Sequence, residues 1–148
     1  MNFFQATKSI LISKPFTFRG RAARSEYLWS LLISIVTVLA SGAIPEDYFG
    51  WQVCYLIFLA YLSIAFFSLH IRRLHDRGYC AWVTLYPVYF FIPGYVIAKS
   101  GTGISSVLVF GGLIIVIAFA VAIYYQIQCL LGSDGHNRYG PGMDTVTK

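Results

Sequence analysis

Charged side chains are scarce in this 148-residue chain, where Asp, Glu, Lys and Arg make up only 11% of the residues. An ordinary soluble domain has about 25%. Hydrophobic residues make up 57%, aromatic residues 18%, and the mean hydropathy is +0.66. This composition excludes a disordered chain, a nucleic-acid-binding tail and an ordinary cytosolic enzyme domain. The class that remains is an integral membrane protein.

Four long segments contain no Asp, Glu, Lys or Arg. They are residues 27–44, 49–71, 80–98 and 104–131. Each is continuously apolar rather than alternating, and each is close to or longer than the roughly 20 residues that a helix needs to cross a bilayer. The sequence therefore predicts an all-α integral membrane protein with four transmembrane helices. It also predicts a single membrane domain over residues 1–148, because the loops are short and no internal repeat is present.

Lys and Arg are unevenly distributed between the two ends of these segments. Ten of the eleven lie in residues 1–26, in the loop 72–79 or in the tail 132–148, and only Lys99 lies elsewhere. Short loops rich in Lys and Arg remain on the cytoplasmic side. We therefore expect a multi-pass protein whose N- and C-termini are both cytoplasmic.

The first thirteen residues have helical periodicity. Phe3, Phe4, Thr7, Ile10 and Leu11 share one side, whereas the other side holds Asn2, Gln5, Lys8 and Ser9. This pattern predicts an amphipathic helix in the membrane interface, with Lys8 and Lys14 toward the lipid headgroups. Pro15 is expected to end it. A frayed terminus is the alternative.

Intramembrane carboxylates and paired cysteines are also missing. A proton-driven multidrug exporter needs an ionisable group at depth, and a disulfide oxidase needs a cysteine pair such as C-x-x-C. The chain has neither, since Cys54, Cys80 and Cys129 are isolated. His and Cys also lack metal-ligand spacing, so we expect no metal and no cofactor. No nucleic-acid partner is expected, because the basic run 19–24 adjoins a span and anchors it.

Three polar segments, 18–27, 72–78 and 132–141, are predicted to lie at the same cytoplasmic interface. Together they hold seven arginines and three acids. In one interpretation, Glu26 and Asp76 pair with Arg73, Arg21 or Arg24 and join the helix ends. In the other, the excess guanidinium groups bind an anionic headgroup or phosphate, which their planar fork suits. The two interpretations are compatible.

The candidate site follows from these segments. The predicted anion or lipid-headgroup contacts are Arg21, Arg24, Arg72, Arg73 and Arg138. The residues predicted to orient them are Glu26, His75, Asp76 and Asn137. No catalytic residue is assigned, because the side chains of adjacent residues diverge on a helix and no nucleophile or phosphate loop accompanies the His75–Asp76 pair.

Three motifs occur in order along the chain. They are Phe18-Arg19-Gly20-Arg21-x-x-Arg24-Ser25-Glu26-Tyr27, Arg72-Arg73-Leu74-His75-Asp76-x-Gly78 and Gly135-x-Asn137-Arg138-Tyr139-Gly140. In these motifs the chain resembles the bacterial "domain of unknown function 805" (DUF805) inner-membrane family, from about residue 3 to residue 142. The resemblance implies a small multispan protein of the bacterial inner (cytoplasmic) membrane. It implies no established biochemical activity.

The function expected from the sequence is that of a non-enzymatic membrane module. Its cytoplasmic Arg/His/Asp/Asn face is expected to bind anionic membrane lipids or a partner protein, and a homo-oligomer is a further expectation. One alternative is a small oligomeric transporter or channel subunit, in which Pro87, Pro93 and Gly94 shape a path. The other is a membrane enzyme that acts on lipid or phosphate substrates.

Overall fold

A computed structural model describes residues 2–41, 49–100, 105–133 and 135–141, and most of these residues are helical. Helix α1 is followed directly by a short π-helix, and a short 3-10 helix leads into α4. The elements in order are α1 (Phe3–Lys8), the π-helix Ser9–Ser13, α2 (Arg24–Ser41), α3 (Phe49–Asp76), the 3-10 helix Ala81–Leu85, α4 (Tyr86–Ser100) and α5 (Ser105–Leu130). The predicted all-α class is confirmed for this part of the chain.

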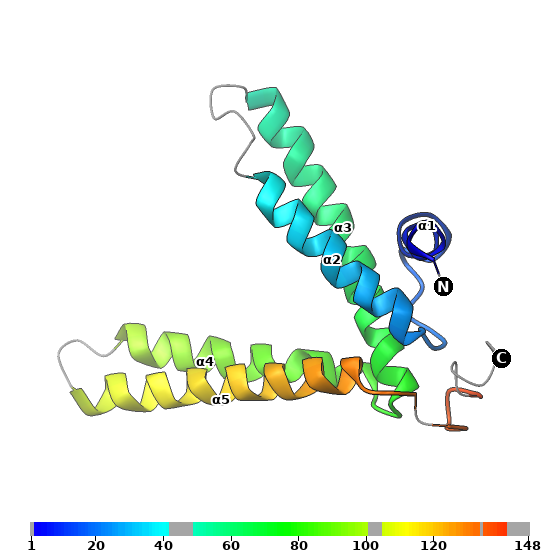
Figure 1. Ribbon diagram of the computed structural model, residues 1–148. Helices are drawn as coiled ribbons and strands as arrows, with labels where there is room; N and C mark the ends of the chain where they lie inside the picture. The colour runs from blue at the N-terminus through cyan, green and yellow to red at the C-terminus, as the bar shows by residue number, and fades with distance from the viewer. Residues whose placement is uncertain (1, 42–48, 101–104, 134, 142–148) are drawn as a thin grey trace.

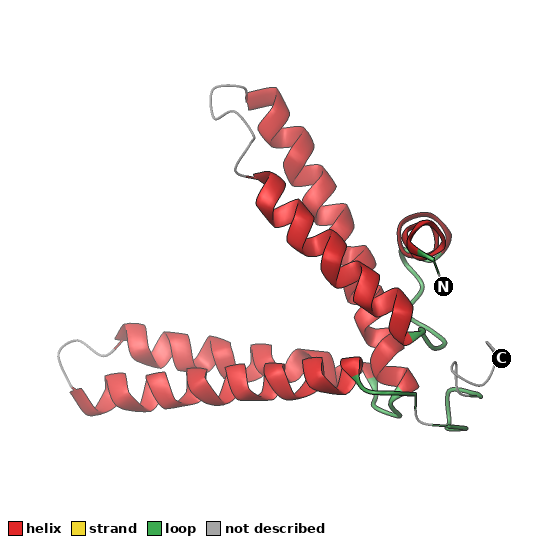
Figure 2. Ribbon diagram, in the orientation of Figure 1, coloured by secondary structure: helices red, strands yellow, loops and turns green. Residues whose placement is uncertain are grey.

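The long helices form two hairpins that diverge from a common end. Figure 1 shows α2 beside α3 and α4 beside α5, and Figure 2 shows the turns that join them at this end. In Figure 1 helix α1 is seen end-on, whereas the long helices lie in the plane of the view, so α1 runs across the hairpins. We call this end the junction, and define it as residues 20–26, 70–79 and 129–141.

Two helices in the described part are long and apolar enough to span a membrane. They cover Gly50–Asp76 and Val109–Leu130, and Ala81–Ile97 forms a shorter apolar helix. Many large hydrophobic side chains of the hairpins are exposed, such as Leu39 at 74% and Val38 at 69%. Apolar side chains on the outside are typical of helices surrounded by lipid. The coarse prediction of a helical membrane protein therefore holds, whereas the count of four spans stays a prediction.

Helix α3 continues five residues beyond the predicted end of its span, to Asp76. It then stops at Gly78, whose φ of +77° is a left-handed conformation that favours glycine. The amide of Gly78 donates to the carbonyl of His75, and the amide of Tyr79 donates to that of Leu74. These two bonds form a Schellman motif, which satisfies the last carbonyls of the helix.

The predicted span 80–98 begins as a 3-10 helix and becomes α-helical only at Tyr86. Pro87 lies in the first turn of α4, where a missing amide proton does little harm, whereas Pro93 lies inside the helix. Gly94 packs closely on α5: a Cβ atom at this position would lie 3.0 Å from Ile114 Cγ2. Small residues allow such close approach between membrane helices.

The predicted N-terminal helix is present, with a shorter α-helical part than expected. Ala6 and Ile10 are fully buried on one side of it, whereas Phe4 is 82% exposed on the other. The ring of Phe3 packs edge-on against Trp29 of α2, with 5.2 Å between the ring centroids. Helix α1 is therefore packed against the hairpin rather than frayed, and its place in a membrane interface stays a prediction.

Candidate functional site: the arginine network at the junction

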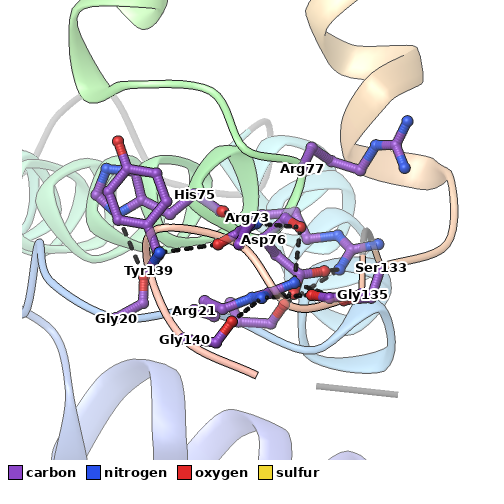
Figure 3. Close-up of polar contacts among 12 residues, drawn as sticks. Gly20, Arg21, Arg73, His75, Asp76, Arg77, Ser133, Gly135, Tyr139 and Gly140 are labelled. Atoms are coloured by element: carbon purple, nitrogen blue, oxygen red, sulfur yellow. Dashed lines mark hydrogen bonds and ion pairs between the residues drawn. The ribbon is translucent and has the colours of Figure 1, made fainter. Parts of the chain in front are cut away.

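Arg21 lies in the segment before α2, and its guanidinium group binds both the end of α3 and the loop after α5 (Figure 3). Its Nε donates to Asp76 Oδ1 at 2.7 Å, and its Nη2 donates to the carbonyl of Asp76 at 2.9 Å. Its Nη1 donates to the carbonyls of Gly135 and Gly140 at 2.9 and 2.6 Å. Its Nη2 also donates to Ser133 Oγ at 2.9 Å. One side chain thus connects α3 to the loop after α5.

Arg73, which lies on α3 itself, also connects α3 to the end of α5. Its Nε donates to the carbonyl of Cys129 at 2.9 Å, and its Nη2 donates to that of Leu131. These carbonyls lie at the C-terminal end of α5, where helical carbonyls lack amide partners and the helix dipole favours a cation. Arg73 Nη1 also donates to the carbonyl of Ala22 and forms an ion pair with Asp76. Arg73 therefore caps one hairpin from the other.

Asp76 is the carboxylate that both guanidinium groups share. Its side chain is fully buried, and it also accepts a hydrogen bond of 2.6 Å from Ser133 Oγ. A buried carboxylate is costly unless charges and hydrogen bonds compensate it, and here both are present. The two arginines outnumber the one carboxylate, and the carbonyl dipoles of α3 and α5 face the remaining positive charge.

The loop after α5 folds back over the end of α3. Asn137 Nδ2 donates to the carbonyl of His75 at 3.1 Å, and the ring of Tyr139 stacks on His75 with 4.0 Å between the centroids. His75 Nδ1 lies 3.2 Å from the carbonyl of Gly20. Gly140 has a φ of +118° and exchanges two backbone hydrogen bonds with Asn137. These contacts bring the loop after α5 onto the second polar segment, residues 72–78.

Arg72 is the most unusual of the buried arginines. Its side chain is 1% exposed, and among the described residues none of its guanidinium nitrogens has a hydrogen-bond partner. Its charge is balanced by Glu26 of α2, with 3.6 Å between Nη1 and Oε1. Glu26 in turn accepts a hydrogen bond of 2.8 Å from Ser9 Oγ in the N-terminal π-helix. This second ion pair ties α3, α2 and the N-terminal helix together.

A separate group of basic side chains is exposed around the junction. It comprises Lys8, Lys14, Arg19, Arg24 and Arg138. Of these, Arg138 donates to the carbonyl of Gly78 at 3.3 Å and lies over the ring of Tyr139. Among the described basic side chains, Arg21, Arg72 and Arg73 are thus buried and these five are exposed. Arg77 is partly buried, and it donates to the carbonyl of Gly132 and to Gln128 Oε1.

The hydroxyl group of Tyr79, the last residue of α3's end of the junction, is hydrogen-bonded to a second tyrosine. The hydroxyl groups of Tyr79 and Tyr124 lie 3.1 Å apart. This hydrogen bond, together with partial burial, raises the pKa of Tyr79 to about 12. Tyr79 is therefore a neutral hydrogen-bonding group close to the exposed basic residues.

The structure brings all nine predicted site residues to the junction, in two different roles. Arg21, Arg72 and Arg73 are buried and face groups of the protein, whereas Arg24 and Arg138 are exposed. Both acids pair with arginines, as predicted: Asp76 pairs with Arg21 and Arg73, whereas Glu26 pairs with Arg72, which was not one of its predicted partners. Whether these arginines contact an anion stays a prediction.

Sequence reasoning missed several acceptors in the network. Ser133 and the carbonyls of Ala22, Cys129, Gly135 and Gly140 were not among the predicted site residues. Backbone carbonyls carry no side-chain signal, so only the turn-forming glycines hinted at their position. In the described part of the chain, no group of three or more His, Cys, Asp and Glu side chains is arranged to hold a metal ion.

Comparison with known proteins places this architecture in a family. The model of a family described as proteins of unknown function, DUF805, matches residues 15–141. The chain belongs to the DUF805 family. The resemblance predicted from the three ordered motifs is thereby confirmed, and every described residue of the junction lies within the matched range.

Two relatives of this DUF805 protein are named inner membrane protein YhaH. The one from Escherichia coli strain K12 is 29% identical over 130 residues, which is 84% of both chains. The one from E. coli O157:H7 has the same identity and coverage. No solved structure matches the chain. The relatives and the apolar helices agree on a bacterial inner-membrane protein.

Proposed function

We propose that this DUF805 protein is a non-enzymatic inner-membrane module whose cytoplasmic face binds anionic phospholipid headgroups. In this proposal α2–α5 each cross the membrane, and both termini are cytoplasmic. The observation that carries it is the division of the basic residues into a buried set, which holds the hairpins together, and an exposed set around the junction. The exposed cations lie at the surface, where lipid phosphates can reach them.

The position of the exposed set supports a lipid ligand. Each hairpin returns the chain to the junction, so the N-terminal helix, α2 and the final loop present their basic residues at the same end (Figure 1). Exposed Phe4, Ile12, Phe16 and Phe18 accompany them. Apolar side chains next to cations favour a water–lipid interface. Each Lys or Arg near an anionic leaflet contributes about 1 kcal/mol of attraction.

The proposal assigns Arg24 and Arg138 as the main headgroup contacts, since these two predicted anion ligands are exposed. Lys8, Lys14 and Arg19 extend the basic surface around them. Arg21, Arg72 and Arg73 act indirectly, since they fix the surface on which the exposed groups lie. Glu26, His75, Asp76 and Asn137 orient this framework.

Native mass spectrometry of the protein released from nanodiscs of phosphatidylethanolamine and phosphatidylglycerol tests the proposal. We expect the wild type to retain phosphatidylglycerol in preference to phosphatidylethanolamine. The variant Arg24→Gln/Arg138→Gln should lose this preference, because two phosphate-binding charges are removed. The matched control Arg24→Lys/Arg138→Lys keeps both charges and should retain most of it. Equal lipid retention by all three proteins would refute the proposal.

A further inference from the structure

A second candidate site lies apart from the arginine network, between α2, α3 and one residue of α5. It is an open cavity of about 410 Å³, at whose mouth Ser63 and Phe67 are exposed, and its volume is within the size range of small-molecule sites. Its lining residues are Tyr27, Ser30, Leu31, Ser34, Ser63, Phe66, Phe67, His70 and Gln126. We call it the α2–α3 cavity.

The spacing of the lining residues shows that the cavity is built by two helix faces. On α2 they lie at positions 27, 30, 31 and 34, and on α3 at positions 63, 66, 67 and 70. Both sets follow the i, i+3, i+4, i+7 pattern of a single helix face. Ser34 lies about 10 Å beyond Tyr27 along the helix axis, so the cavity extends from the junction into the apolar part of the hairpin.

The polar groups of the cavity are neutral. No Asp, Glu, Lys or Arg is present among the described residues that line it. A charged ligand would therefore leave its charge uncompensated at this depth, which is unfavourable. Leu31, Phe66 and Phe67 add an apolar wall. These features together select a neutral ligand that has both a polar head and an apolar part.

The hydroxyl groups determine which polar head fits. Ser30, Ser34 and Ser63 donate their protons to the carbonyls of Tyr27, Leu31 and Leu59, at 2.6, 2.8 and 2.8 Å. Each serine oxygen keeps a lone pair and becomes an acceptor. The cavity is therefore rich in acceptors and suits a ligand that carries hydroxyl donors.

The end of the cavity near the junction provides a hydrogen-bond donor rather than acceptors. The hydroxyl of Tyr27 donates to Gln126 Oε1, and His70 Nδ1 lies 3.4 Å from the same hydroxyl. The amide nitrogen of Gln126 remains a donor. An ester carbonyl placed there would accept from it, while hydroxyl groups of the same molecule donate to the serines. A glycerol ester has this combination of groups.

We propose that the α2–α3 cavity binds a neutral glycerol head, either of a monoacylglycerol-type lipid or of free glycerol. This site uses residues outside the basic surface. A failure of this proposal would therefore not affect the proposal of anionic headgroup binding, and the reverse is also true. The probes are 1-monooleoylglycerol and glycerol, added to the full chain in nanodiscs and measured by native mass spectrometry. We expect one monooleoylglycerol molecule to be retained per chain.

The variant Ser34→Ala/Ser63→Ala removes two acceptors with little change of volume. It should weaken retention of monooleoylglycerol at least about tenfold. The matched control is Thr37→Val on α2, whose hydroxyl makes the same kind of bond to the carbonyl of Ile33 but does not line the cavity. It should retain the lipid. Since the double variant loses only side-chain hydroxyls, its helical circular dichroism should equal that of the wild type.

A cavity-filling variant, Ser63→Phe, provides an independent test, because it leaves the α2 hydroxyls in place and should also abolish binding. Competition by glycerol alone would assign the site to the free polyol, and retention of monooleoylglycerol despite excess glycerol would assign it to the lipid. Equal retention by wild type, Ser34→Ala/Ser63→Ala and Ser63→Phe would overturn the proposal. So would retention of phosphatidylglycerol at this site with the same sensitivity, because the ligand would then not need a neutral head.

Discussion

Arg21 and Asp76 form a buried ion pair across 55 residues of sequence, with 2.7 Å between Nε and Oδ1. The pair joins the segment before α2 to the end of α3. Arg73 binds the same carboxylate and extends the network to the end of α5. One buried acid and two arginines therefore hold the two hairpins together, along with the contacts of Arg77 to Gly132 and Gln128.

Replacement of Asp76 tests this dependence. Asp76→Asn leaves two buried guanidinium groups without a counter-charge, which should lower the free energy of unfolding by about 3–5 kcal/mol. The measurement is SDS-induced unfolding in mixed micelles. Arg19→Gln alters an exposed arginine in the same segment as Arg21 and should have little effect. Equal stability of the two variants would contradict the assigned role of Asp76.

The second ion pair makes a separate prediction. Glu26→Gln should destabilise the docked N-terminal helix, because Arg72 has only this carboxylate as a charge partner among the described residues. We expect a protease to cleave the variant within residues 2–13 faster than it cleaves the wild type. Adding Arg72→Met should restore much of the protection, since the unpaired charge is then gone. If the double variant is cleaved faster than Glu26→Gln, the pairing is not what holds the helix.

Gly140 is expected to resist substitution because of its backbone. Its φ of +118° is unfavourable for any residue with a Cβ atom, although no atom lies within 4 Å of where that Cβ would be. Gly140→Ala should lower stability by about 1–2 kcal/mol. Gly135→Ala, in the same loop and equally uncrowded but without this backbone conformation, is the control. Thermal melts that show the same loss for both would rule out conformational strain as the cause.

Gly94 is expected to resist substitution for a different reason, which is space. A Cβ atom there would lie 3.0 Å from Ile114 Cγ2 and 3.1 Å from the carbonyl oxygen of Gly111. Gly94→Ala should therefore separate α4 from α5 and destabilise the hairpin by about 1–3 kcal/mol. Gly112→Ala meets no atom within 4 Å and should be neutral or slightly stabilising. A neutral Gly94→Ala in the same unfolding assay would contradict the close packing.

Much of this arrangement was predictable from the sequence because simple patterns encode it. Uninterrupted apolar runs predicted the hairpin helices, and the clustering of Lys and Arg predicted that three distant segments meet. That both acids pair with arginines also followed from residue type, whereas Arg72 as the partner of Glu26 was not predicted. These features depend on residue type rather than on geometry.

Other features were not predictable, because they depend on backbone geometry. The sequence did not show that Arg73 would cap α5 or that Arg21 would bind the carbonyls of Gly135 and Gly140, since carbonyls are present at every residue. It also did not separate Arg72 from Arg24, which differ in burial rather than in chemistry. The α2–α3 cavity was missed because its serines resemble ordinary packing residues of membrane helices.

The division of the arginines into a buried and an exposed set is the central claim, and one paired measurement tests it most directly. Unfolding free energy and phosphatidylglycerol retention are measured for Arg73→Gln and Arg24→Gln. We predict that Arg73→Gln loses stability but retains lipid in the molecules that remain folded, and that Arg24→Gln loses lipid but keeps its stability. The opposite result, in which Arg73→Gln is stable and loses the lipid, would contradict the account.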